Sequence, residues 1–226
     1  MVKQFLIPFL LLFFISCQTP SESCENQNEA ASVTSCTQEP DQPGSHDNIF
    51  LPSPEDIPPS EAYLFDAQIH YVNFGPSDQE KVEKAIELIK TVIASPEFKH
   101  RVVNYTYEGK KAFVDNKGFS NEEIYLKLID GKEDLFPEVD YQMDLELELY
   151  YSSRNTVGYT YPNSTRIWMN TKYFNVFTPA EVAGNIFHEW IHKLGFDHAS
   201  SYSISRDSSV PYAIGYLIRD LGRNYE

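Results

Sequence analysis

Three histidines and one glutamate with the spacing of a metal site lie within eleven residues of this sequence. Positions 188–198 read HEWIHKLGFDH. His188 and His192 are four residues apart, so on a helix they lie about 40° apart around the axis and about 6 Å apart along it. Both imidazoles can then reach one metal ion. Glu189 lies next to the first ligand without being forced to bind the metal, which suits a general base that acts on metal-bound water.

The residues after the second histidine predict a third ligand. Gly195 can adopt a left-handed conformation that ends the helix, and the chain then turns so that His198 can reach the same ion. Three histidine ligands leave the fourth coordination position open for water, as in catalytic zinc sites. We therefore expect one Zn²⁺ per chain, bound by His188, His192 and His198, with Glu189 as the catalytic residue.

The flanking sequence predicts the helix that these residues need. Thr178-Pro-Ala-Glu181 is a capping-box pattern with proline at the first helical position, where its missing N–H costs nothing. We expect the helix that opens there to run to about Leu194. Pro211 is expected to start a last helix, which ends near Gly222.

Upstream segments predict a small sheet and further helices. Residues 143–151 alternate apolar and polar side chains, which is the period of a half-buried strand. Capping boxes at 77–80 and 120–123 precede segments with apolar residues at helical spacing. Strands are expected at 65–74, 143–151, 157–161 and 166–170, a hairpin at 102–107 and 111–114, and helices at 77–95 and 120–129. The expected fold class is α/β (α+β), a small mixed sheet packed on helices, with the active-site helix followed by a C-terminal helix.

The motif HExxHxxGxxH resembles that of the metzincin clan of zinc endopeptidases. In that clan a short sheet packs on helices, and the last strand before the active-site helix lies along the cleft. Residues 157–161 and 166–170 hold the corresponding place here. The resemblance covers about residues 61–226, although only the motif is specific. It implies the same zinc ligands and the same general base as the spacing does.

One position departs from the metzincin pattern. Metzincins have a methionine-containing turn beneath the metal, and here Pro211 stands in the place of that methionine, which leaves the subfamily open. Tyr212 or Tyr216 could donate a hydrogen bond to the oxyanion, or either could be an ordinary core aromatic. Asp197 could orient a ligand, or it could be a solvated loop acid.

Residues 1–17 predict a lipoprotein signal peptide. Lys3 precedes an apolar run of about eleven residues, too short to span a bilayer. The run ends at Ile15-Ser16-Cys17, which resembles a bacterial lipobox. We expect lipid on Cys17 to attach the protein to the bacterial cell envelope, with the outer membrane or cell surface favoured because Gln18 is not the aspartate that often retains lipoproteins at the inner membrane. An ordinary signal peptide cleaved elsewhere and release from the cell are the alternatives.

Residues 18–60 predict a disordered acidic tether. They hold eight acids, no lysine or arginine, and seven of the fourteen prolines. Such a segment cannot bury enough apolar surface to offset its ordering entropy. Cys24 and Cys36 could form a disulfide there, or one of them could bind the metal and keep the enzyme latent. Residues 61–226 remain as one catalytic domain.

The charge excludes one class of partner, and the motif favours one function. The formal net charge is −15 with no basic block, so nucleic acid is not an expected partner. We expect a zinc-dependent endopeptidase that hydrolyses peptide bonds in a protein or peptide substrate. The alternatives are a surface lipoprotein that binds a host or envelope partner through a structural zinc, and a zinc amidase that acts on a non-protein amide. The sequence leaves the oligomeric state and the cleavage specificity open.

Overall fold

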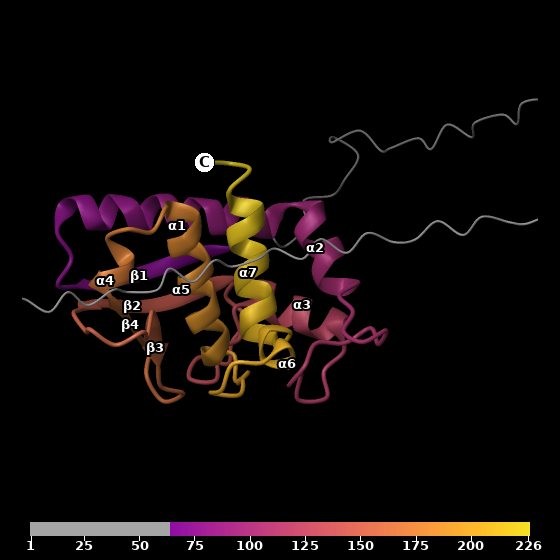
Figure 1. Ribbon diagram of the computed structural model, residues 1–226. Coiled ribbons are helices and arrows are strands. Elements are labelled where there is room, and N and C mark those ends of the chain that lie inside the picture. Colours follow the sequence, from indigo (N-terminus) through magenta and orange to yellow (C-terminus); the bar gives the residue numbers. More distant parts are fainter. Residues whose placement is uncertain (1–63) are drawn as a thin grey trace, which may run out of the picture. The chain divides into compact units, whose positions relative to one another are not determined.

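The computed structural model describes residues 64–226. Their elements follow one another as β1 (Asp66–Val72), α1 (Pro76–Ala94), α2 (Pro96–Val103), α3 (Asn121–Asp130), β2 (Gln142–Tyr150), β3 (Gly158–Thr160), β4 (Arg166–Asn170), α4 (Thr171–Phe174), α5 (Pro179–Lys193), α6 (Ile204–Asp207) and α7 (Val210–Gly222) (Figure 1). The expected signal peptide and tether lie outside the described residues. Within the described part of the chain, no helix is both long and apolar enough to cross a membrane.

The four strands form one mixed sheet in the order β1-β2-β4-β3. β1, β2 and β4 are parallel, and β3 runs antiparallel to β4 at the edge. In β2, the alternation expected from the sequence is present: Met143, Leu145, Leu147 and Leu149 are buried and the residues between them are only half-buried. The expected α/β fold class is thereby confirmed.

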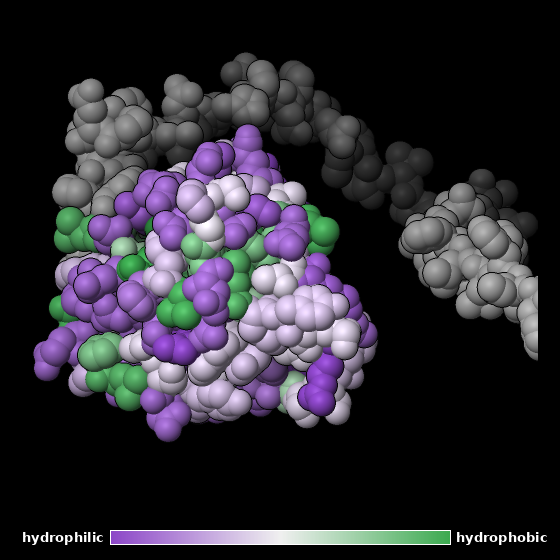
Figure 2. All heavy atoms as spheres, turned by 90° about the vertical axis from the view of Figure 1, so that its left-hand side faces the viewer, coloured by the Kyte–Doolittle hydropathy of each residue, from purple (hydrophilic) through white to green (hydrophobic). Residues whose placement is uncertain are grey.

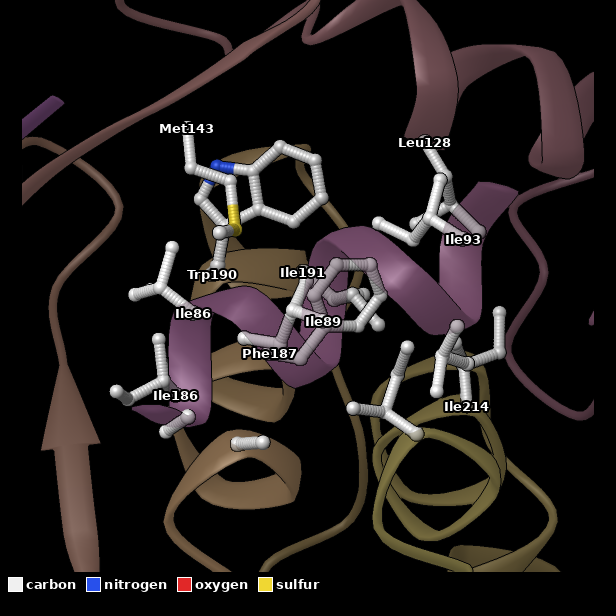
Figure 3. Packing of buried hydrophobic residues seen from close by; sticks show 14 of the residues in the cluster. Ile86, Ile89, Ile93, Leu128, Met143, Ile186, Phe187, Trp190, Ile191 and Ile214 are labelled. Atoms are coloured by element: carbon white, nitrogen blue, oxygen red, sulfur yellow. The ribbon is translucent and has the colours of Figure 1, made fainter. Parts of the chain in front are cut away.

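The helices bury their apolar faces against each other and against the sheet. α1 contacts both α5 and α7, and α5 also contacts β3 and β4. Figure 1 shows α5 and α7 side by side. Figure 3 shows Ile86, Ile89 and Ile93 of α1 in the same cluster as Trp190 of α5 and Ile214 of α7. The helix that carries the histidine motif is therefore fixed by core packing on several sides.

The surface contrasts with this continuous core. On the face of the molecule that Figure 2 shows, hydrophobic residues form several separate patches among hydrophilic ones. Separate patches of this kind are usual on a protein surface and do not by themselves indicate a binding site.

Two details of the first helices differ from the sequence prediction. α1 begins at Pro76 rather than after Ser77, because Gly75 is its N-cap and the Asp78 carboxylate accepts the Gly75 N–H at 3.2 Å. The expected hairpin at 102–107 and 111–114 was wrong.

The upstream part of that expected hairpin belongs to a helix. Ser95 caps α2 by accepting the Phe98 N–H, and Pro96 occupies the first turn. Phe98 and Val102 are four residues apart and both are buried, so helical burial overrides the strand preference of Val102-Val103. Only an isolated bridge between Tyr107 and Lys110 remains of the hairpin.

Candidate metal centre

The expected active-site helix forms as the capping box predicted. In α5, Thr178 accepts the Glu181 N–H, and the Glu181 carboxylate accepts the Thr178 N–H in return at 3.0 Å. The helix ends at Lys193 with Leu194 as its C-cap. His188, Glu189 and His192 therefore lie within two turns of one regular helix.

A glycine turns the chain back after α5. Gly195 has a φ of +84°, and its N–H donates to the His192 carbonyl at 3.1 Å. The positive φ favours glycine, and a Cβ atom on Gly195 would lie 2.7 Å from Asp134 Oδ2, so a larger residue would also displace the Asp134 side chain. The Asp134 N–H donates to the Lys193 carbonyl at 2.8 Å and so joins the 131–141 loop to this turn. The turn brings His198 back toward α5.

The structure brings the three predicted ligands together. One nitrogen from each of His188, His192 and His198 lies within 4.8 Å of the other two, and all three residues are half-buried. The Nε2 atoms of His188 and His198 are 3.2 Å apart. Two ligands on a tetrahedral zinc at ≈ 2.0–2.1 Å are about 3.3 Å apart, so this spacing fits the ion. The triad can hold a metal ion.

Backbone carbonyls orient the rings of the triad. His192 Nδ1 lies 2.7 Å from the Phe196 carbonyl oxygen, and His198 Nδ1 lies 3.0 Å from that of Ala199. His188 is hydrogen-bonded to the backbone of Pro211. Such bonds fix the tautomer and the ring plane of a metal-binding histidine and leave its other nitrogen for the metal. Each of the three rings is thus already oriented by the backbone.

Burial keeps two of these histidines neutral. Desolvation, reinforced by the neighbouring His192 and His198, lowers the pKa of His188 well below its usual value. Desolvation is also the main cause of the lowered pKa of His192. A neutral imidazole has the free lone pair that a metal ion requires, so these two rings are ready to bind a metal at neutral pH.

Glu189 is enclosed beneath the edge strand. It is 5% exposed, and burial raises its pKa to about 8, with Lys193 acting in the opposite direction. A Cβ atom on Gly158 of β3 would lie 3.2 Å from Glu189 Oε1 and 3.1 Å from Asn185 Oδ1. The glycine in β3 therefore leaves the space in which this carboxyl group sits.

Asn185 was not identified from the sequence, although it lies one turn before Glu189. Its Oδ1 atom is buried and has no hydrogen-bond partner among the described residues. Both Asn185 Oδ1 and an ionised Glu189 carboxylate accept hydrogen bonds, so they cannot satisfy each other. Asn185 Oδ1 and Glu189 Oε1 both border the space that Gly158 leaves open.

Lys193 also lies within the motif, but only the fold reveals its contacts. Its Nζ atom contacts Thr160 Oγ1 and the Ser164 carbonyl, and it donates to the Tyr161 and Arg166 carbonyls at 3.3 and 3.1 Å. It is 3% exposed, and burial lowers its pKa to about 8. The lysine therefore attaches the β3–β4 connection to the end of α5.

A second buried charged residue holds the other side of α5. Glu133 is 2% exposed and accepts hydrogen bonds from the Trp190 indole N–H and, at 3.0 Å, from the Asp144 N–H. Burial raises the pKa of Glu133 to about 7. The sequence offered no signal for this contact, because 57 positions separate the glutamate from the tryptophan.

The last helix begins at the position of the Met-containing turn of metzincins. α7 starts at Val210 with Pro211 in its first turn, as expected. The Tyr212 ring centroid is 4.4 Å from that of His188 and 4.5 Å from that of His198. Tyr212 therefore packs directly on the triad, whereas Tyr216 packs on Tyr212, with ring centroids 5.7 Å apart.

Two glycines allow α7 to approach the motif this closely. A Cβ atom on Gly215 would lie 3.0 Å from the His188 Cβ atom, and one on Gly184 of α5 would lie 2.8 Å from the Gly215 carbonyl oxygen. Larger residues at either position would separate the helices. The crossing of α5 and α7 thus places Tyr212 over the histidines.

The Asp197 carboxylate lies nearer to the imidazole of His192 than to that of His198, its neighbour in the sequence. Its Oδ1 atom is 3.8 Å from His192 Nδ1, whose closer partner is the Phe196 carbonyl. Its Oδ2 atom is 3.2 Å from Lys117 Nζ, and the side chain is 66% exposed. Asp197 is therefore chiefly a paired surface acid.

A cleft of about 740 Å³ runs past the triad. Its lining comes from the 155–160 segment that includes β3, from one face of α5, and from α6 and α7. The polar and ionisable side chains in the lining include Asn185, His188, Glu189, His192, His198, Arg206, Tyr212 and Arg219. All four sequence-predicted site residues thus lie in one cleft.

Comparison of the sequence with known protein families and curated proteins identifies no relative. No protein-family model matches the sequence, and no curated protein is similar enough to indicate a relationship. The histidine triad that can hold a metal ion is therefore the feature from which a function can be inferred.

Proposed function

We propose that this protein is a zinc-dependent endopeptidase of the metzincin type in which Glu189 is the general base. The observation that carries the proposal is the convergence of three backbone-oriented histidines on one point, in the wall of a cleft that also contains a buried carboxyl group. Open coordination in a cleft is typical of catalytic zinc, whereas structural zinc sites are closed by four protein ligands.

The donor set favours zinc among the common divalent ions. Three neutral imidazoles suit Zn²⁺, whereas Ca²⁺ and Mg²⁺ prefer oxygen ligands. When bound, zinc would lower the pKa of a coordinated water and polarise the carbonyl of the scissile bond. A dication at the triad also favours the ionised form of Glu189 by electrostatic attraction, and this opposes the effect of burial on its pKa.

The protein residues then supply proton transfer and positioning. The Glu189 carboxylate takes a proton from the attacking water and returns it to the leaving amine nitrogen. Tyr212, which packs on two of the histidines, would donate its hydroxyl hydrogen to the developing oxyanion. Lys193 holds the β3–β4 connection against α5, so the two walls of the cleft keep their spacing.

The edge strand favours an extended peptide as substrate. Among the strands of residues 64–226, β3 pairs only with β4, and residues 155–160 line the cleft, so a peptide can add to the sheet beside the triad by main-chain hydrogen bonds. A non-peptide amide would not use this edge. The metzincin resemblance implies that the last strand before the active-site helix lies along the cleft, but here β3, the strand before the last, lines it and β4 does not. Pro211 in place of the methionine leaves the subfamily open.

Envelope display belongs to the same proposal. Cys17 and the tether lie outside the described residues, so the lipid anchor rests on the Ile15-Ser16-Cys17 pattern alone. An anchored peptidase at the outer membrane or cell surface would meet proteins or peptides from outside the cell or from the envelope.

A digest with a matched variant tests this function. The full chain, loaded with one equivalent of zinc, is incubated with casein and with a peptide library, and products are identified by mass spectrometry. We expect internal cleavage that a chelator abolishes and zinc restores. Glu189→Gln should retain zinc but lose turnover by at least ≈ 10²–10⁴-fold, the usual contribution of general base catalysis. Equal turnover in the two proteins, or no cleavage of any peptide by the zinc-loaded parent, would contradict the proposal.

A further inference from the structure

Arg206 of α6 is a charged residue in the cleft wall that the proposed mechanism does not use. Its guanidinium carbon lies 4.4 Å from the Tyr212 ring centroid and 5.0 Å from that of Tyr202. The side chain is only 16% exposed. The guanidinium thus packs on the ring of Tyr212, and the exposed ring of Tyr202 also lies near it.

One edge of this guanidinium already has a partner. Nε and Nη2 donate to Asp207 Oδ1 at 3.3 and 3.1 Å. An arginine side chain has five N–H donors, and no described residue accepts from Nη1. Asp207 lies outside the cleft lining, whereas Arg206 is part of it. The aspartate therefore helps to orient the guanidinium and leaves the edge that includes Nη1 without a partner among the described residues.

The guanidinium is close to where the scissile bond would lie. Tyr212 lies between the guanidinium and the triad. Its ring centroid is 4.4 Å from the Arg206 guanidinium carbon and 4.5 Å from the His198 ring centroid. Arg206 is thus within about 9 Å of the His198 ring, which an extended peptide spans in two or three residues. An aspartate or glutamate side chain adds its own length to that of the main chain, so a carboxylate one or two residues from the scissile bond can reach the guanidinium.

The acids that line the cleft are either paired with a base or buried. Asp197 is paired with Lys117 at 3.2 Å, and Glu181 with Arg223 at 3.2 Å. The remaining acid, Glu189, is buried beneath β3. Among the charged groups in the lining, Arg206 is the one that packs directly on the tyrosine of the triad.

We propose that Arg206 binds a carboxylate of the substrate, so that the peptidase prefers peptides with a carboxylate one or two residues from the scissile bond. This inference rests on the proposed peptidase function. A planar guanidinium edge matches a carboxylate in a bidentate pair, which gives both affinity and selectivity. The carboxylate can come from an aspartate or glutamate side chain or from the C-terminus of a peptide.

Paired peptides distinguish these two sources. One pair has glutamate or glutamine beside a cleavage site found in the library digest, with the C-terminus amidated, and the second pair has a free or an amidated C-terminus two residues after that site. We expect kcat/KM to be about 10- to 100-fold higher for the peptide with the carboxylate in at least one pair, as for hydrogen bonds to charged groups. The pair that shows the difference identifies the source.

Variants assign the preference to one arginine. Arg206→Gln should remove the difference between the paired peptides, and Arg206→Lys should keep only part of it because an ammonium group cannot form the fork. Arg219→Gln is the matched control, since Arg219 also lines the cleft over a tyrosine, Tyr216, and is also paired with the next residue. It should keep the preference. Zinc content and melting temperature show whether each variant is folded.

A binding measurement separates this inference from the proposed function. Fluorescence anisotropy of the labelled peptide pairs on the full-length Glu189→Gln protein reports selectivity without turnover. We expect tighter binding of the carboxylate peptide, and Arg206→Gln in that background should abolish the difference. If the parent cleaves both peptides of each pair equally well, the Arg206 inference is wrong and the peptidase proposal stands. The same holds if Arg219→Gln, rather than Arg206→Gln, abolishes the preference for the carboxylate peptide. If the parent cleaves nothing, the peptidase proposal fails, and equal or absent binding of the pairs then overturns this inference too.

Discussion

Replacing Glu189 by glutamine should stabilise the metal-free protein, and the gain should depend on pH. Burial raises the pKa of Glu189 from 4.5 to about 8. Between these values the folded protein keeps the proton that the unfolded chain has lost. The free energy of unfolding of the parent therefore falls as the pH rises through this window, whereas a glutamine has no proton to lose.

The expected size follows from the width of the window. One unit of pKa difference corresponds to ≈ 1.4 kcal/mol, so the stability difference between Glu189→Gln and the parent should grow by about 3 kcal/mol from pH 5.5 to pH 8. Groups that do not interact with Glu189, such as Glu133, titrate alike in both proteins and cancel in the difference. Lys193, which interacts with Glu189, is the exception.

Urea unfolding of the chelator-treated proteins at the two pH values provides the measurement. Glu83→Gln makes the same chemical change at an exposed position of α1 and should show nearly the same stability difference from the parent at pH 5.5 and pH 8. Zinc should reduce the pH dependence of the parent, because it favours the ionised glutamate. If the stability difference for Glu189→Gln is equal at both pH values in the metal-free proteins, the carboxyl group is not buried as described.

Three further substitutions test the site and the anchor. His192→Ala should abolish stoichiometric zinc binding in metal analysis of the purified protein, and a variant that still holds one zinc would exclude His192 as a ligand. Gly195→Ala should cost about 1–3 kcal/mol in urea unfolding and weaken zinc binding, because alanine disfavours a φ of +84° and its Cβ would meet Asp134; unchanged stability would refute the need for glycine. Cys17→Ser should release the protein into the soluble fraction or block its processing, and unchanged fractionation would count against the lipid anchor.

The sequence by itself determined the parts of the site that are local in the chain. The i, i+4 spacing of His188 and His192 needs only a regular helix, and the capping box at Thr178 predicts where that helix begins. Gly195 predicts where it ends, since few other residues adopt its backbone conformation. The alternation in β2 likewise predicted its buried face.

Local pattern was insufficient where two structures compete for the same residues. Val102 and Val103 favour a strand by type, yet Ser95 and Pro96 start a helix and the buried pair Phe98 and Val102 keeps it. In such a segment the outcome depends on which face can be buried, and that is decided by the rest of the fold.

Tertiary structure alone decided what surrounds the triad. The burial of Glu189 depends on a glycine 31 positions earlier, in β3, and the place of Tyr212 depends on the crossing of α5 and α7. The contacts of Lys193 likewise join α5 to Thr160 and Arg166, which lie 33 and 27 positions earlier in the chain. Helix spacing and capping act over a few residues, whereas burial, pKa and cleft shape are sums over neighbours that only long-range packing brings together.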